Sequence, residues 1–248
     1  MTTTTGPAAA YSANADYWVT IIRGDRDRYR TELTNAAMLD AIGDVAGLDV
    51  LDAGCGEGYL SRRLAGAGAQ AVGVDICPEL VIAARERAAA DGLEISYEVA
   101  DAASLPLGDA SVDVIVANHL LNDLRDPAPA VAEFARVLRP GGQLTAIMLH
   151  PCFYGVRGVL SESNPAGYFG VRPIEQHFLV DGLRSPAPAV SWARPLQDHV
   201  GILTGAGLVI TGLIEPRPTD DQLTGPDPWW RENYRYPLFL LLTARKLP

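Results

Sequence analysis

Short apolar runs alternate with amphipathic stretches over residues 48–149. The apolar runs predict five strands, Val50–Ala53, Ala71–Val74, Ile95–Val99, Val112–Ala117 and Leu144–Leu149. Apolar positions at helical spacing predict the intervening helices Gly58–Ala67, Glu79–Ala90 and Pro129–Leu138. Strands that alternate with helices pair in parallel, so the pattern predicts a doubly wound α/β sheet.

The segments that flank this alternation have other patterns. Residues 11–45 predict helices, which either pack on the core or close as a flap over a ligand. Residues 151–198 are rich in Gly, Pro and aromatic residues and predict a long irregular segment, which in a compact domain usually has a function. We interpret it as a lid that shapes a substrate pocket. The core pattern then resumes with a helix near Leu196–Ala206 and strands near Leu208–Glu215 and Leu238–Ala244.

We therefore expect a single domain of 248 residues, a length that allows one full core with an elaborated lid. Its expected parts are an N-terminal helical flap (1–45), a cofactor-binding core (46–150), a substrate lid (151–198) and the C-terminal part of the core (199–248).

The charge balance limits the classes of binding partner that we expect. The formal net charge is −10 and no basic run is present, which disfavours nucleic acid and favours a small-molecule substrate. Three cysteines, Cys55, Cys77 and Cys152, form no metal pattern and no disulfide framework. No apolar run is long enough to span a bilayer, and the N-terminus lacks the pattern of a signal peptide. We expect a cytoplasmic protein with no membrane partner and no metal, and a homodimer could form through the helix with Tyr17 and Trp18.

The candidate chemistry lies just after the predicted strands, where open parallel sheets bind ligands. A glycine loop, Asp52–Gly58, joins the first strand to a helix, whose N-terminus points free N–H groups and a positive dipole at the loop. With the carboxylates of Asp52 and Glu57, this site suits a nucleotide-like ligand that carries a cationic or amine group. It suits a bare pyrophosphate less well.

The ends of the later strands add further candidates. Asp75 can accept both ribose hydroxyls of a nucleoside, and its neighbour Ile76 can lie against the base. Asp101, which precedes Ala102, can accept the exocyclic amine of adenine. Asn118, His119 and His150 follow the fourth and fifth strands, so they are further candidates for contact with a ligand at this edge of the sheet.

These residues resemble the motifs of the class I S-adenosylmethionine-dependent methyltransferases. The matching runs occur in the family's order and at its usual separations: Val50–Gly58, Gly73–Ile76, Asp101–Ala102 with Leu105–Pro106, and Val137–Gly142. The resemblance implies a Rossmann-like, mostly parallel seven-stranded sheet whose last strand is antiparallel. It also implies S-adenosylmethionine as the cofactor and S-adenosylhomocysteine as its product.

The resemblance further implies a role for each matching residue. Asp52 and Gly54 would lie by the methionine portion, Gly56 would also contact the cofactor, and the backbone at Asn118 would meet the cofactor's amino group. Tyr11 or Tyr17 would reach its carboxylate. The remaining cofactor contacts would be Asp75 to the ribose and Ile76, Asp101 and Ala102 to the adenine.

Methyl transfer from a sulfonium is a direct displacement, so the enzyme mainly aligns the reacting atoms and excludes water. We expect the acceptor to be an O, N or C atom of a small organic molecule, such as a secondary metabolite. A base would help an acidic hydroxyl or a ring carbon, and the candidates are His150, His119 and His177, with Tyr154 or Tyr168 as alternatives. The run Asn118–Leu121 departs from the Asn-Pro-Pro-Tyr motif of relatives that methylate amide or base nitrogens, which disfavours such substrates.

Two alternatives stay open at this point. A nicotinamide oxidoreductase also has a strand, a glycine loop, a helix and an acid, but its third glycine is replaced here by Tyr59, and Glu57 would face the pyrophosphate. A protein that keeps the cofactor without transferring methyl, either a regulator or a cyclase-like enzyme, is not excluded because methyl transfer requires no signature residue.

Overall fold

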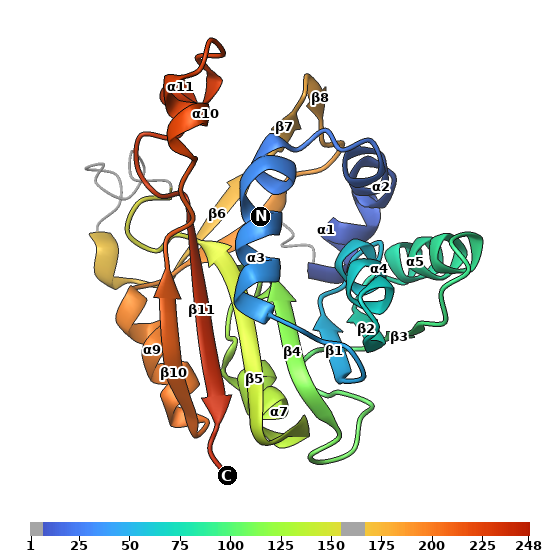
Figure 1. The fold of residues 1–248 in the computed structure, drawn as a ribbon. Helices are drawn as coiled ribbons and strands as arrows, with labels where there is room; N and C mark the ends of the chain where they lie inside the picture. The colour runs from blue at the N-terminus through green and yellow to red at the C-terminus, as the bar shows by residue number, and fades with distance from the viewer. Residues whose placement is uncertain (1–6, 155–166) are drawn as a thin grey trace, which may run out of the picture.

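A seven-stranded sheet forms the centre of the computed structural model, which describes residues 7–154 and 167–248 (Figure 1). The strand order is β10-β11-β5-β4-β1-β2-β3. β11 is antiparallel to both of its neighbours, and the pairs from β5 to β3 are parallel. This confirms the predicted doubly wound, mostly parallel Rossmann-like sheet. The strands are β1 (Asp49–Ala53), β2 (Gln70–Asp75), β3 (Ser96–Val99), β4 (Val112–Asn118), β5 (Leu138–Leu149), β10 (Leu208–Ile214) and β11 (Phe239–Lys246).

Helices cover both faces of the sheet because successive strand residues bury apolar side chains on opposite sides. On one face Ile115 and Leu144 pack against Phe134, in the cluster that also includes Leu203. On the other face Ile147 belongs to a second apolar cluster. The first cluster is completed by α7 (Ala128–Val137) and α9 (Leu196–Gly205), and the second by α3 (Asn35–Ile42) and α4 (Tyr59–Gly66), while α5 (Pro78–Ala90) packs beside β2 and β3.

The run Pro140-Gly141-Gly142 lies inside β5, after the end of α7. α7 ends at Val137, and Leu138 already pairs with Val112. The register then shifts, so that Val114 pairs with Gln143. A Cβ at Gly142 would lie 2.9 Å from the backbone oxygen of Asp113, which explains why glycine occupies this irregularity.

The N-terminal region is helical, as expected, but it is broken into shorter pieces. They are α1 (Pro7–Ala13), α2 (Ala15–Arg23), a π-helical turn (Arg30–Thr34) and α3. The first break falls at Asn14, whose side-chain amide donates to Ala187 and whose side-chain oxygen accepts from it. α1 and α2 therefore lie against the lid segment, above the carboxyl ends of the strands (Figure 1).

The prediction of an irregular lid over residues 151–198 is wrong for the described part, which contains paired strands. β6 (Arg172–Gln176) pairs antiparallel with β9 (Ala189–Ala193), and β7 (Leu179–Val180) forms a hairpin with β8 (Leu183–Arg184). Residues 155–166 of the expected lid lie outside the described residues. Short elements that sequence patterns did not predict are the 3₁₀ turn Gly167–Phe169, α6 (Leu120–Asp123), α10 (Asp220–Thr224) and α11 (Trp229–Asn233).

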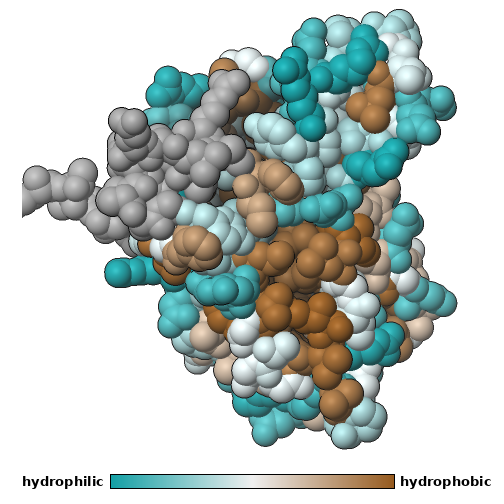
Figure 2. Space-filling view, turned by 90° about the vertical axis from the view of Figure 1, so that its left-hand side faces the viewer, coloured by the Kyte–Doolittle hydropathy of each residue, from teal (hydrophilic) through white to brown (hydrophobic). Residues whose placement is uncertain are grey.

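The two aromatic residues that were named for a dimer contact are not freely exposed. Tyr17 is 7% exposed and Trp18 lines an internal cavity, so these two residues do not form a free face. Figure 2 shows apolar side chains on the side of the molecule that carries the edge strand β10, where Val209 and Leu213 are exposed. In residues 7–154 and 167–248, no helix is both long and apolar enough to cross a membrane.

Candidate active site

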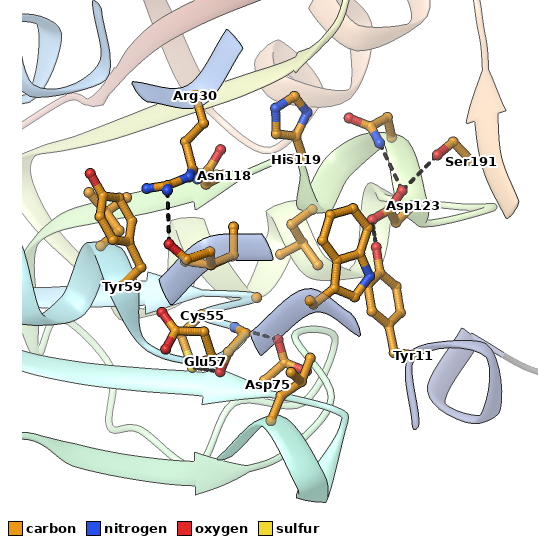
Figure 3. A pocket seen from close by; sticks show the side chains of 18 of the residues that line it. Tyr11, Arg30, Cys55, Glu57, Tyr59, Asp75, Asn118, His119, Asp123 and Ser191 are labelled. Atoms are coloured by element: carbon orange, nitrogen blue, oxygen red, sulfur yellow. Dashed lines mark hydrogen bonds between the residues drawn. The ribbon is translucent and has the colours of Figure 1, made fainter. Parts of the chain in front are cut away.

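A cavity of about 660 Å³ lies above the carboxyl ends of β1, β2 and β4, a volume typical of small-molecule sites. Its floor is the glycine loop and the strand ends, and its cover comes from α1, α2 and the lid strands. Figure 3 shows the polar side chains that converge on it. The cavity brings together these predicted cofactor residues: Asp52, Gly54, Gly56, Asp75, Ile76, Asp101, Ala102 and Asn118.

Asp75 organises the glycine loop. One carboxylate oxygen accepts a hydrogen bond from the Gly56 N–H at 2.8 Å, and the other accepts from the Cys77 N–H at 2.9 Å. Burial raises the pKa of Asp75, while these backbone donors act in the opposite direction. Each carboxylate oxygen has a further lone pair, so Asp75 can still accept ribose hydroxyls.

Asp52 is a buried carboxylate with an unsatisfied atom. It is 1% exposed, and its Oδ2 accepts a hydrogen bond from Ser61 Oγ at 2.6 Å. Its Oδ1 is buried and has no partner among the described residues. Burial raises the pKa of Asp52 to about 6, despite the Ser61 bond. An orphaned carboxylate oxygen on a cavity wall fits a ligand that brings a cation or an N–H donor, such as the methionine portion of S-adenosylmethionine.

An apolar slot with a carboxylate at its rim follows β2 and β3. Ile76 is 39% exposed although it is a large apolar residue, and Ala102 is buried. Asp101 uses Oδ1 to accept from the Ala103 N–H at 2.9 Å, which leaves its Oδ2 for a ligand. This arrangement fits a planar base that carries an amine.

Glu57 does not act as the free carboxylate that the sequence suggested. It is 3% exposed and pairs with Arg62 at 2.8 Å and with Arg23 at 3.1 Å. Two guanidinium groups neutralise it, so its contribution is to tie α4 and α2 to the glycine loop.

The two histidines that were the first candidates for a base differ in position: one lines the cavity and the other does not. His119 lines the cavity, and burial lowers its pKa, so its imidazole is neutral at pH 7 and can accept a proton. His150 does not line this cavity: its Nε2 lies 3.0 Å from Glu215, and its Nδ1 accepts from the Cys152 N–H at 3.1 Å. Both ring nitrogens of His150 have hydrogen-bond partners and the residue is 4% exposed, so it does not face this cavity.

Some of the other predicted side chains also line the cavity, and others do not. Tyr154 and His177 line the cavity, where the Tyr154 hydroxyl accepts from Gln176 at 2.9 Å. Tyr168 does not line it, and its hydroxyl accepts from the Leu196 N–H at 2.8 Å. Of the two tyrosines expected near the cofactor carboxylate, Tyr11 lines the cavity and Tyr17 does not.

Arg30 is a cavity residue that sequence reasoning missed. It is 6% exposed, and its Nη2 donates to the Ile22 carbonyl and to Asp25. Its Nε and Nη1 are buried without a partner among the described residues, and its guanidinium lies 4.4 Å from the centre of the Tyr59 ring. Figure 3 shows it reaching toward Tyr59 near the glycine loop. Such a group suits an anion within the cavity.

Together, the doubly wound sheet and a cavity of acids and glycines at its carboxyl edge define a Rossmann-like enzyme that binds an amino-acid-bearing nucleoside. A family model described as a methyltransferase domain matches residues 51–146. The chain is 32% identical over 168 residues to a ubiquinone biosynthesis O-methyltransferase of Xanthomonas oryzae pv. oryzae, covering 64% of this chain and 68% of that protein. This chain belongs to the class I S-adenosylmethionine-dependent methyltransferase family.

Solved structures agree with this assignment. An S-adenosylmethionine-dependent methyltransferase of Mesorhizobium loti has a TM-score of 0.64 at 28% identity, over 85% of this chain and 95% of that one. The cyclase SpnF has a TM-score of 0.66 at 20% identity, over 97% of this chain and 94% of that one, which is a likeness of fold alone. The protein is thus an S-adenosylmethionine-dependent methyltransferase, and the nicotinamide alternative is wrong.

Proposed function

We propose that this enzyme methylates an O, N or C atom of a small organic molecule with an apolar or aromatic part, as in secondary metabolism. The observation that carries the proposal is the aromatic cover of the cavity. Trp18 and Phe178 meet edge to face with ring centres 4.8 Å apart, and Tyr29 and Phe239 do so at 5.6 Å. All four rings line the cavity, so an acceptor beside the cofactor would meet them.

The proposal is tested with methyl-labelled S-adenosylmethionine and a panel of phenols, aromatic amines and aliphatic alcohols of matched size. We expect label to appear in the aromatic acceptors in preference to the alcohols. Conversion of an acceptor without label would favour a cyclase-like activity, and preferential labelling of RNA or protein would overturn the small-molecule proposal.

Three further expectations stay predictions from the sequence. They are the division into flap, core and lid, the homodimer and the cytoplasmic location.

In the cofactor arrangement that we propose, Asp75 holds the ribose, Asp101 and Ile76 hold the adenine, and Asp52 faces the methionine portion. The bound cofactor supplies an electrophilic methyl group on its sulfonium. We assign its carboxylate to Arg30, because two N–H groups of this residue are buried on the cavity wall without a protein partner.

Replacing Arg30 with methionine, which keeps the apolar stem, is expected to weaken S-adenosylhomocysteine binding about 10- to 100-fold, the usual effect of losing a hydrogen bond to a charged group. Binding of methylthioadenosine, which lacks the carboxylate, should change less than threefold. The control is Arg63→Met, since exposed Arg63 lies over the same Tyr59 ring at 5.7 Å. Equal losses for both ligands in calorimetry would contradict the assignment.

We also propose His119 as the base for an acceptor that must lose a proton. Replacing His119 with glutamine should lower kcat about 100-fold or more for a phenolic acceptor, within the range for general-base catalysis. The affinity for S-adenosylhomocysteine should stay unchanged. The matched control, His150→Gln, should leave kcat within a few-fold because that side chain faces Glu215. A kcat loss in the His150 variant alone would reverse this choice.

A further inference from the structure

Asp123, at the end of α6, accepts hydrogen bonds from three directions at the cavity wall. The Tyr11 hydroxyl of α1 donates to its Oδ2, and Ser191 Oγ of β9 donates to its Oδ1 at 2.9 Å. The side-chain amide of Asn122 also donates to Oδ1, at 2.8 Å. Figure 3 shows Tyr11 and Ser191 reaching this one carboxylate from opposite sides. Asp123 is not among the cofactor or base residues assigned above.

The cluster has no cationic member. Among the described residues, no Arg, Lys or His forms an ion pair with Asp123. Burial raises its pKa to about 6, even though its three hydrogen bonds act in the opposite direction. A carboxylate enclosed without a counter-charge is costly and depends on its donors. The hydroxyls of Tyr11 and Ser191 are therefore important for holding the Asp123 carboxylate. The carboxylate is equally important for holding these two donors.

The elements that carry these two donors cover the cavity and also contact each other. Asn14, between α1 and α2, forms two hydrogen bonds with the backbone of Ala187, just before β9. Ser191 is 5% exposed, and α1 contacts β9. The carboxylate of Asp123 joins both parts of this cover to the core, because α6 follows directly after β4.

We propose that Asp123 is a positioning residue that makes α1 and β9 close over the bound cofactor as one unit. The proposal rests on cofactor binding in this cavity and not on the identity of the acceptor. A cofactor enclosed in this way leaves only when the bonds from Tyr11 and from Ser191 open together. Closure then excludes water and keeps the methyl donor aligned with the acceptor.

The test is the dissociation rate of S-adenosylhomocysteine from the full chain, followed by tryptophan fluorescence because Trp18 lines the cavity. Tyr11→Phe and Ser191→Ala each remove one hydroxyl, and each should raise the rate about 10-fold. If both bonds must open together, the double variant should raise it by the product, about 100-fold. If α1 and β9 open independently, the two effects only add, to about 20-fold or less, and the proposal is overturned.

Controls separate this role from a general loss of structure. Tyr236→Phe removes an exposed hydroxyl outside the cavity and should leave the rate unchanged. Asp123→Ala should match the double variant, but should it fail to fold, the hydroxyl variants decide alone. Unchanged rates in both single variants would also overturn the proposal. Because no acceptor is used, failure of the small-molecule proposal would leave these rates unaffected.

Discussion

Replacing Asp75 with alanine is expected to weaken S-adenosylmethionine binding by about 100-fold or more. The variant loses the proposed acceptor for two ribose hydroxyls, and hydrogen bonds to a charged group contribute about 1.5–3 kcal/mol each. It also loses the acceptor of the Gly56 and Cys77 N–H groups, so the glycine loop and the start of α5 are no longer tied to one carboxylate. Calorimetry with S-adenosylhomocysteine measures the loss directly.

The control for Asp75 is Asp40→Ala, since Asp40 is exposed and does not line the cavity. It should leave the affinity unchanged. Circular dichroism of the Asp75 variant should show an intact sheet, because the carboxylate lies at the end of β2 and not within its ladder. An affinity within threefold of the natural protein would mean that Asp75 does not hold the ribose.

Replacing Asp52 with asparagine is expected to stabilise the cofactor-free protein at pH 8 and to weaken cofactor binding about 10- to 100-fold. The carboxylate is buried with one oxygen unpartnered, and its pKa is raised to about 6 from the usual 3.8. Ionising it in the folded protein at pH 8 costs on the order of 2–3 kcal/mol. The variant removes this cost, and for a chain of this size, at about 2–4 °C per kcal/mol, Tm should rise by about 4–12 °C. It also removes the negative charge that we propose faces the methionine portion.

The pH dependence of this effect has a defined sign. The folded state holds the Asp52 proton more tightly than the unfolded chain does, so stability from this group is complete below about pH 4. It is lost as the pH rises through about 6. The Tm difference between Asp52→Asn and the natural protein should therefore be small near pH 4 and reach its full value above pH 7. A difference that shrinks as the pH rises would contradict this account.

Asp113→Asn is the control of opposite sign. Burial raises the pKa of Asp113, but hydrogen bonds from Arg139 and the Asp49 N–H outweigh this and hold the pKa below its usual value. Here the charged form is stabilised in the folded protein, so the asparagine variant should lower Tm at pH 8. Both variants remove one negative charge, so net charge alone cannot explain opposite shifts.

The sheet was predictable because each of its central strands is buried on both faces and needs a continuous apolar run. Leu51 and Ile115 lie in such runs and are fully buried. The lid was not predictable in the same way. The paired strands β7 and β8 have two residues each, which is too short for any periodicity to appear in the sequence.

The cofactor-binding loop could also be predicted from the sequence, because the residues that form it lie close together in the chain. Gly56 and Asp75 are separated only by α4 and β2, and their hydrogen bond joins residues 19 apart. The residues that sequence reasoning missed depend on distant partners. Asp123 meets Tyr11 over a separation of 112 residues and Ser191 over 68, and no local pattern marks such a cluster.

The sequence by itself determined the class of fold, the nucleoside-binding loop and the cofactor, since these follow from strand periodicity and from residues close together in the chain. Only the tertiary structure decided which of several similar side chains faces the cavity. His119 lies on its wall while His150 turns to Glu215, and Tyr11 lines the cavity while Tyr17 does not. The physical reason is that the direction of a side chain after a strand is set by the packing of segments far away in the sequence, which no local pattern encodes.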